Sequence, residues 1–127
     1  MDGFFLDVWD EGDSTTIVCK GELDIATAGR LREAVAKALD SRPGRLILDG
    51  NGLSFLSAAG ITALVEAVDR ARRHSVDLEL SLSKKARRVL DVVGLWWLGI
   101  VDDGFAVEEA LDDALRRYAE QARRLAI

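Results

Sequence analysis

Residues 45–65 read RLILDGNGLSFLSAAGITALV, and this stretch decides the fold. The first five residues, Arg45 to Asp49, are a short apolar run typical of a strand covered on both faces, as in a parallel sheet. The glycine-rich segment Gly50–Leu56 predicts a loop. A helix is then expected to begin at Ser57, whose hydroxyl is a candidate N-cap. Strand, loop and helix in this order form the repeating unit of an α/β sheet.

Two strands and a helix are predicted before this stretch. Residues 4–9 and 15–20 are rich in β-forming side chains and flank a turn cluster, so we expect a hairpin. Apolar residues then recur at spacings of three and four from Ala28, which predicts a helix that ends near Ser41, before the only proline. Asp24 or Thr27 is the expected N-cap of that helix.

Four further elements are predicted after residues 45–65 and the helix that begins there. Residues 76–82 alternate as in a strand with one buried face, and residues 84–93 have helical spacing. A very short strand at Ile100–Val101 and a long amphipathic helix over 107–125 complete the series. The order predicts a single α/β domain over residues 1–127. Its sheet is mixed and mostly parallel, with four to five strands, an antiparallel edge and about four helices.

Composition excludes several classes of function. The 127 residues (13.9 kDa) fit one domain, and 17 basic against 22 acidic residues give a net charge of −5, which disfavours nucleic-acid binding. One cysteine and one histidine build neither an internal disulfide nor a Cys/His zinc site. A basic segment followed by an apolar run is absent from the first residues, as is any run of 18 apolar residues, so we expect a cytoplasmic protein that is not bound to a membrane.

Enzyme motifs are missing as well. We interpret His74 as a helix-end cation and Cys19 as a buried structural thiol. The sequence has no Gly-x-Ser-x-Gly elbow, no phosphate-loop motif and no dinucleotide fingerprint. We therefore expect no catalytic residues, no cofactor and no metal. A small-molecule or nucleotide binder stays as a minor hypothesis, supported only by the glycine segment and the helix start behind it.

Five short motifs occur in an order that resembles a known family. They are Gly21-Glu22-Leu23-Asp24, Thr27-Ala28-x-x-Leu31-Arg32, Arg45-Leu46-Ile47-Leu48-Asp49, Phe55-Leu56-x-x-x-Gly60-Ile61 and Gly94-Leu95. In this order the sequence resembles a STAS domain, and the Gly-Glu-Leu-Asp form is most similar to the stand-alone bacterial anti-sigma factor antagonists. The resemblance covers about residues 4–115, which is the expected core of the domain.

The resemblance implies a partner-binding switch and no enzymatic activity. Such a protein binds an anti-sigma factor, a Ser/Thr kinase with a histidine-kinase-like ATP-binding fold, and so releases a sigma factor. The kinase phosphorylates a serine at the start of the second helix, and a PP2C-type phosphatase removes the phosphate. The residues that would contact the partner are Asp24, Leu56, Ser57, Ala58, Ala59, Gly60 and Ile61.

This sequence departs from the family pattern at the phosphorylation site. The family reads Asp-Ser-Ser/Thr-Gly, whereas this chain reads Ser57-Ala58-Ala59-Gly60, so the acceptor position is an alanine without a hydroxyl. Three hypotheses follow: an antagonist that binds without a phosphoserine switch, a switch phosphorylated at Ser57, and a scaffold or accessory subunit of a signalling or transport-associated assembly.

Other features leave two interpretations open. Asp24 is either an N-cap or an acidic contact residue near the acceptor position. Trp96 and Trp97 are either core residues or anchors for a partner. The basic clusters at 70–73 and 84–88 are either solvated helix surface or contacts for an acidic partner.

Overall fold

The computed structural model describes residues 3–92, which form one four-stranded sheet with helices packed on it. The elements are β1 (Phe4–Glu11), β2 (Ser14–Leu23), α1 (Ala28–Asp40), β3 (Arg45–Leu56), α2 (Ala58–Arg73), β4 (Asp77–Leu82) and α3 (Lys84–Val92). The strand order is β1-β2-β3-β4; β1 is antiparallel to β2, and the other pairs are parallel. The predicted α/β class, mostly parallel sheet and antiparallel edge are confirmed.

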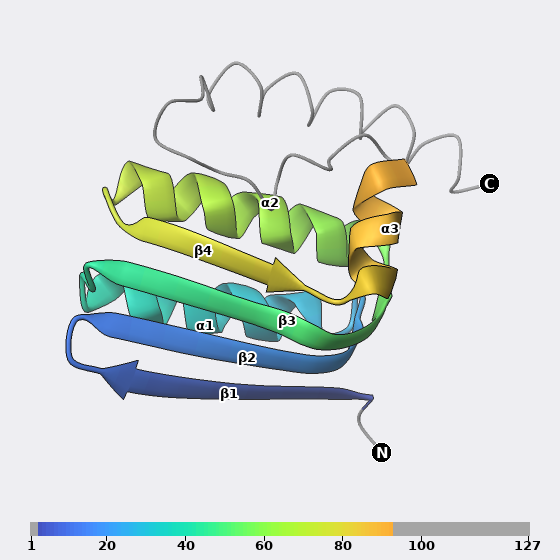
Figure 1. Cartoon of the computed structure of the whole chain (residues 1–127), viewed down its shortest axis with the longest axis horizontal. Coiled ribbons are helices and arrows are strands. Elements are labelled where there is room, and N and C mark those ends of the chain that lie inside the picture. Colours follow the sequence, from blue (N-terminus) through green and yellow to red (C-terminus); the bar gives the residue numbers. More distant parts are fainter. Residues whose placement is uncertain (1–2, 93–127) are drawn as a thin grey trace.

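The helices lie on one face and at one end of this sheet. Figure 1 shows α1 and α2 side by side behind the strands, with α3 at the end where β3 and β4 finish. An ion pair between Arg32 and Glu66 (2.7 Å) joins α1 to α2. The core between the two layers is apolar and continuous. Its most deeply buried side chains are Ile17, Leu23, Leu31, Leu39, Leu46, Leu48 and Leu64.

The hairpin and the first helix follow the sequence prediction. β1 and β2 pair without a break from Phe4↔Gly21 to Glu11↔Ser14, and Gly12 takes a positive φ of 62° in the turn between them. In α1, Val35 stands one turn from both Leu31 and Leu39, and all three side chains are buried. The hairpin therefore supplies the edge of the sheet, and α1 covers the strands beside it.

The sequence prediction is wrong for Gly50–Leu56, because this segment continues β3. It stays paired with β2 up to Leu23↔Leu56, with two register shifts, and Leu53 and Leu56 are buried. Its glycines permit neighbouring side chains to pack closely against the strand. A Cβ at Gly50 would lie 2.8 Å from Leu82 Cδ2, and a Cβ at Gly52 would lie 2.6 Å from Lys20 Cγ.

The predicted burial of Arg45–Asp49 on both faces is also wrong within the described residues. Leu46 and Leu48 are buried beneath the helices, whereas Ile47 and Asp49 on the other face are half-buried and Arg45 is exposed. The apolar run therefore belongs to a strand that the described helices cover on one face only. β4 has the predicted single buried face, with Leu80 and Leu82 in the core.

The second half of the predicted series is described only as far as α3. α2 begins after Ser57 as expected, and α3 matches the predicted helix over its described residues. The predicted strand at Ile100–Val101, the helix over 107–125, and Trp96 with Trp97 lie outside the described residues. Within residues 3–92, no helix is long and apolar enough to cross a membrane.

Candidate functional site at the start of the second helix

The candidate site lies where two parallel strands end and two helices begin. β2 and β3 finish side by side at Leu23 and Leu56, and the chain then enters α1 and α2 (Figure 1). The backbone N–H of Ser57 donates to the carbonyl oxygen of Leu23 (3.0 Å), which fixes the start of α2 against the end of β2. The carboxyl edge of a parallel sheet is where α/β folds present their binding surfaces.

Ser57 is the N-cap of α2, as the sequence predicts. Its backbone is extended (φ −89°, ψ 175°), and its Oγ accepts a hydrogen bond from the backbone N–H of Gly60 (3.3 Å). Its carbonyl oxygen accepts the first helical bond, from the N–H of Ile61 (2.9 Å). Ser57 therefore satisfies a helix N–H group that would otherwise lack an intrahelical partner.

The predicted contact residues divide into a buried set and an accessible set. Leu56 and Ile61 are 5% and 2% exposed, so both belong to the core. Gly60 is also buried, and a Cβ there would lie 2.4 Å from the carbonyl oxygen of Leu23, so only glycine fits. Ser57 and Ala59 are half-buried. The first helical residue, Ala58, is exposed.

Asp24 is an organiser of the loop before α1. Its Oδ1 accepts hydrogen bonds from the backbone N–H groups of Ala26 (2.9 Å) and Thr27 (3.1 Å) and from the Thr27 hydroxyl (3.1 Å). Thr27 occupies the N-cap position of α1, but its side chain makes no capping bond there. The prediction of Asp24 as the N-cap is wrong: its side chain forms an Asx-type turn with the residues before α1, and only its carbonyl oxygen bonds the helix, by accepting from the N–H of Ala28 (2.8 Å). Asp24 stays half-buried.

Two apolar side chains of this surface were missed by sequence reasoning. Ile25 is 86% exposed in the loop before α1, and Phe55 is 52% exposed one residue before the end of β3. The signal for Phe55 is its place next to buried Leu56 in a strand, where adjacent side chains point to opposite faces. Alternation does not hold through the whole segment, because Leu53 and Leu56 are both buried. Ile25 lies in a turn, where no periodicity shows whether an apolar side chain is buried.

Phe55 also lines a shallow groove between the end of β3 and α3. The groove has a volume of about 480 Å³. Its lining is mostly apolar, with two basic side chains at its margin. The residues are Ser54, Phe55, Leu56, Lys85, Ala86, Arg88, Val89 and Val92. The surface at the start of α2 therefore continues, through Phe55, onto α3.

The reactive side chains considered from the sequence lie elsewhere. Cys19 is buried in β2, and burial, together with the negative charge of Asp49, raises the pKa of its thiol to about 12. His74 is the C-cap of α2, and its Nδ1 lies 2.8 Å from the carbonyl oxygen of Arg70. Within residues 3–92, no group of three His, Cys, Asp or Glu side chains is placed to hold a metal ion. The site itself presents mainly small neutral and apolar groups, with the half-buried carboxylate of Asp24 beside them.

Sequence comparisons find similar proteins of known family. Residues 9–98 match the family model of the STAS domain. The chain is 30% identical over 86 residues to the anti-sigma-F factor antagonist RsfA of Mycobacterium tuberculosis, covering 65% of this chain and 67% of that protein. It is 25% identical over 114 residues to RsfB, an antagonist with the same description from the same organism, covering 90% and 88%.

Solved structures share the fold. A crystal structure of an anti-sigma factor antagonist from Mycobacterium paratuberculosis superposes with a TM-score of 0.65 at 24% identity, covering 91% of this chain and 94% of that one. The anti-sigma factor antagonist SpoIIAA in its unphosphorylated form gives a TM-score of 0.60 at 22% identity, covering 87% and 94%.

Proposed function

Because the chain belongs to the STAS domain family, we propose that it is an anti-sigma factor antagonist that binds its anti-sigma factor without a phosphoserine switch. The observation that carries the proposal is the exposed Ala58 at the first position of α2, where the family resemblance puts the acceptor serine. The names of RsfA and RsfB support the general function. Such a role would be carried out in the cytoplasm.

The proposed contact surface consists of the accessible residues around the start of α2. Ala58 lies at its centre, Ser57 and Ala59 beside it, and Ile25 and Phe55 add exposed apolar area. Large apolar side chains surrounded by small neutral groups are favourable contact points, because their burial costs no desolvation of charge. The buried residues Leu56, Gly60 and Ile61 hold this surface in shape and do not contact the partner.

A phosphate at the start of α2 would change this surface strongly. It would bring about −1.5 to −2 charges into the middle of an otherwise neutral contact. Ala58 has no hydroxyl to accept it. Ser57 has one, but the residue is half-buried and its hydroxyl oxygen accepts the bond from Gly60 N–H. The proposed partner is a kinase with a histidine-kinase-like ATP-binding fold. We therefore expect the chain to stay unmodified and to keep binding this partner when ATP is present. No substrate then remains for a PP2C-type phosphatase.

Binding calorimetry with candidate anti-sigma factors from the same genome tests the surface. Ala58→Asp buries an unpaired carboxylate at the centre of the contact, so affinity should fall by roughly 30-fold or more. The control is Ser75→Asp, which adds the same charge at the other end of α2, at an exposed position with φ 56° that aspartate tolerates. Equal affinities for both variants would show that the contact surface lies elsewhere.

Intact-mass spectrometry tests the missing switch. The wild-type chain and a Ser57→Ala variant are incubated with the bound anti-sigma kinase and ATP. The proposal predicts no added phosphate on either chain. A phosphate on the wild type alone would identify Ser57 as the acceptor and would overturn the absence of a switch. A phosphate on both chains would overturn it too, and would move the acceptor to another residue.

A further inference from the structure

β1 forms one edge of the sheet built by residues 3–92, at the side away from β4. All eight of its residues, Phe4–Glu11, pair with β2 without a bulge, and the strand contains no proline. A long and regular edge strand leaves one row of backbone N–H and C=O groups without a partner strand. Two backbone groups of β1 have side-chain partners instead: the N–H of Val8 donates to Asp7 Oδ1 (3.0 Å), and the carbonyl oxygen of Phe4 accepts from Arg30 Nη1 (3.3 Å). Natural proteins usually interrupt such edges with bulges or prolines, which this strand lacks.

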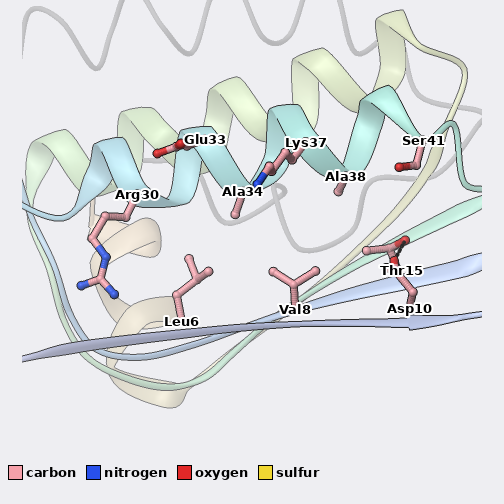
Figure 2. A pocket seen from close by; sticks show the side chains of 10 residues that line it. All are labelled: Leu6, Val8, Asp10, Thr15, Arg30, Glu33, Ala34, Lys37, Ala38 and Ser41. Carbon is pink, nitrogen blue, oxygen red and sulfur yellow. Dashed lines mark hydrogen bonds between the residues drawn. The ribbon is translucent and has the colours of Figure 1, made fainter.

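Both faces of β1 carry accessible apolar side chains. On the helix side, Leu6 is half-buried and Val8 is 42% exposed, and Figure 2 shows both pointing toward α1. Because side chains alternate along a strand, Phe5 and Trp9 lie on the opposite face, where they are 60% and 55% exposed. These four side chains lie within five consecutive residues at the edge of the sheet.

The helix side of β1 is open because α1 presents small residues there. Figure 2 shows Ala34 and Ala38 facing β1 across a groove. The larger apolar residues of α1, Leu31, Val35 and Leu39, are buried in the core. The groove has a volume of about 630 Å³. Its lining residues are Leu6, Val8, Asp10, Thr15, Arg30, Glu33, Ala34, Lys37, Ala38 and Ser41. A strand added beside β1 would therefore not collide with the helix layer over Leu6 and Val8.

We propose that β1 pairs antiparallel with β1 of a second copy of this chain, about a two-fold axis at Asp7. In an antiparallel pair, the numbers of two residues that lie directly opposite each other always add up to the same value. For a two-fold axis at Asp7, that value is twice the residue number of Asp7. With Asp7 at the centre, Phe5 of each copy lies opposite Trp9 of the other on one face, and Leu6 lies opposite Val8 on the other face. The strand is thus complementary to itself on both faces, as a two-fold interface requires.

The same register puts the two Asp7 carboxylates opposite each other. Within one copy, the Asp7 carboxylate accepts hydrogen bonds from the backbone N–H of Val8 (3.0 Å) and from Nε1 of Trp9 (2.6 Å). Like charges directly opposite in a sheet are destabilising, and a partner strand must also displace the Asp7 carboxylate from the N–H of Val8, so Asp7 weakens the dimer on both counts. Acidic residues on edge strands protect against unlimited association in this way.

The area available also indicates a weak dimer. A buried aromatic side chain contributes about 150–250 Å², and about half of each is still exposed on Phe5 and Trp9. The side chains of two copies together would bury about 500 Å², less than half of the roughly 1,200 Å² at which stable interfaces begin. We therefore expect a reversible monomer–dimer equilibrium that becomes visible at high protein concentration.

Sedimentation velocity on the full chain, from about 5 to 500 µM, tests the proposal. Wild type should shift reversibly from monomer toward dimer, and Trp9→Ser should remain monomeric over the same range. Because Trp9 is about half exposed, this variant should keep its fold. Asp7→Asn removes the central repulsion and should tighten the dimer about two- to fivefold. Asp77→Asn changes the charge equally on β4 and should match wild type.

The outcomes are distinct. Monomeric wild type and monomeric Asp7→Asn at 500 µM would overturn the proposal, whether the edge is unused or takes a strand from another protein. A dimer insensitive to Trp9→Ser and Asp7→Asn would overturn it as well, since its interface would lie elsewhere. Ala58→Asp should dimerise like wild type, so loss of anti-sigma factor binding and loss of dimerisation are separately measurable.

Discussion

Replacing Gly60 with alanine tests how the start of α2 is held against the sheet. A Cβ at this position would lie 2.4 Å from the carbonyl oxygen of Leu23 and 3.0 Å from Leu23 Cγ. The carbonyl oxygen is part of the backbone at the end of β2, and it already accepts the N–H of Ser57. Neither the end of β2 nor the start of α2 can move without disturbing that hydrogen bond. To make room for the added Cβ, the first turn of α2 must shift away from β2.

The expected cost combines two opposing effects. Forcing an extra methyl group into a packed site costs about 1–3 kcal/mol. Alanine is favoured over glycine in a helix by about 0.5–1 kcal/mol, which offsets part of this cost. We therefore expect Gly60→Ala to lower the free energy of unfolding by about 1–2 kcal/mol. The matched control is Gly29→Ala in α1, where nothing lies within 4 Å of the added Cβ, so the helix preference should raise the stability by up to about 1 kcal/mol.

Urea unfolding followed by circular dichroism measures both variants against wild type. The midpoints should move in opposite directions, downward for Gly60→Ala and upward for Gly29→Ala. If Gly60→Ala were as stable as wild type or more so, the close approach of α2 to Leu23 would be wrong, and so would the shape of the proposed contact surface. The same variant should also bind the anti-sigma factor more weakly, because Ala58 and Ala59 move with the first turn.

Three further predictions concern stability and reactivity. Ser57→Ala should lower the free energy of unfolding by about 1 kcal/mol through loss of the N-cap, measured in urea; an unchanged midpoint would contradict the capping role. Cys19, with its thiol pKa raised to about 12, should stay unmodified by a thiol reagent at about pH 8 in the folded chain and react once urea unfolds it; rapid labelling of the native protein would contradict its burial. A double-mutant cycle on Arg32 and Glu66, both more than a third exposed, should give a coupling of only about 0.2–1 kcal/mol; a value above 2 kcal/mol would contradict solvent screening of this pair.

The periodic parts of the fold were predictable from the sequence. The hairpin, the helices over 28–41 and from 57 onward, and the strand over 76–82 each have a period that matches one secondary structure. The segment Gly50–Leu56 was not predictable in the same way. Glycine favours loops when only the local sequence is considered, but here it permits the neighbours Lys20 and Leu82 to approach closely within a sheet.

The start of α2 was predictable from the sequence, whereas the exposure of the residues around it was not. The motif around Ser57 identified the start of α2, because an N-cap and the end of a strand leave local signals. Which residues of the motif reach the surface depends on tertiary packing: Ile61 turns inward, Ala58 outward. The exposure of Ile25 and Phe55 follows from the turn and from the extended β3, neither of which local periodicity reveals.

The proposed absence of a phosphoserine switch is tested most directly by the effect of ATP on the complex with an anti-sigma kinase. Fluorescence anisotropy follows the complex over time after ATP is added, for wild type and for Ala58→Ser, which restores a hydroxyl at the exposed first position of α2. Wild type should stay bound and carry no phosphate, whereas Ala58→Ser should become phosphorylated and be released. Release of wild type by ATP, with a phosphate on the released chain, would contradict the proposal.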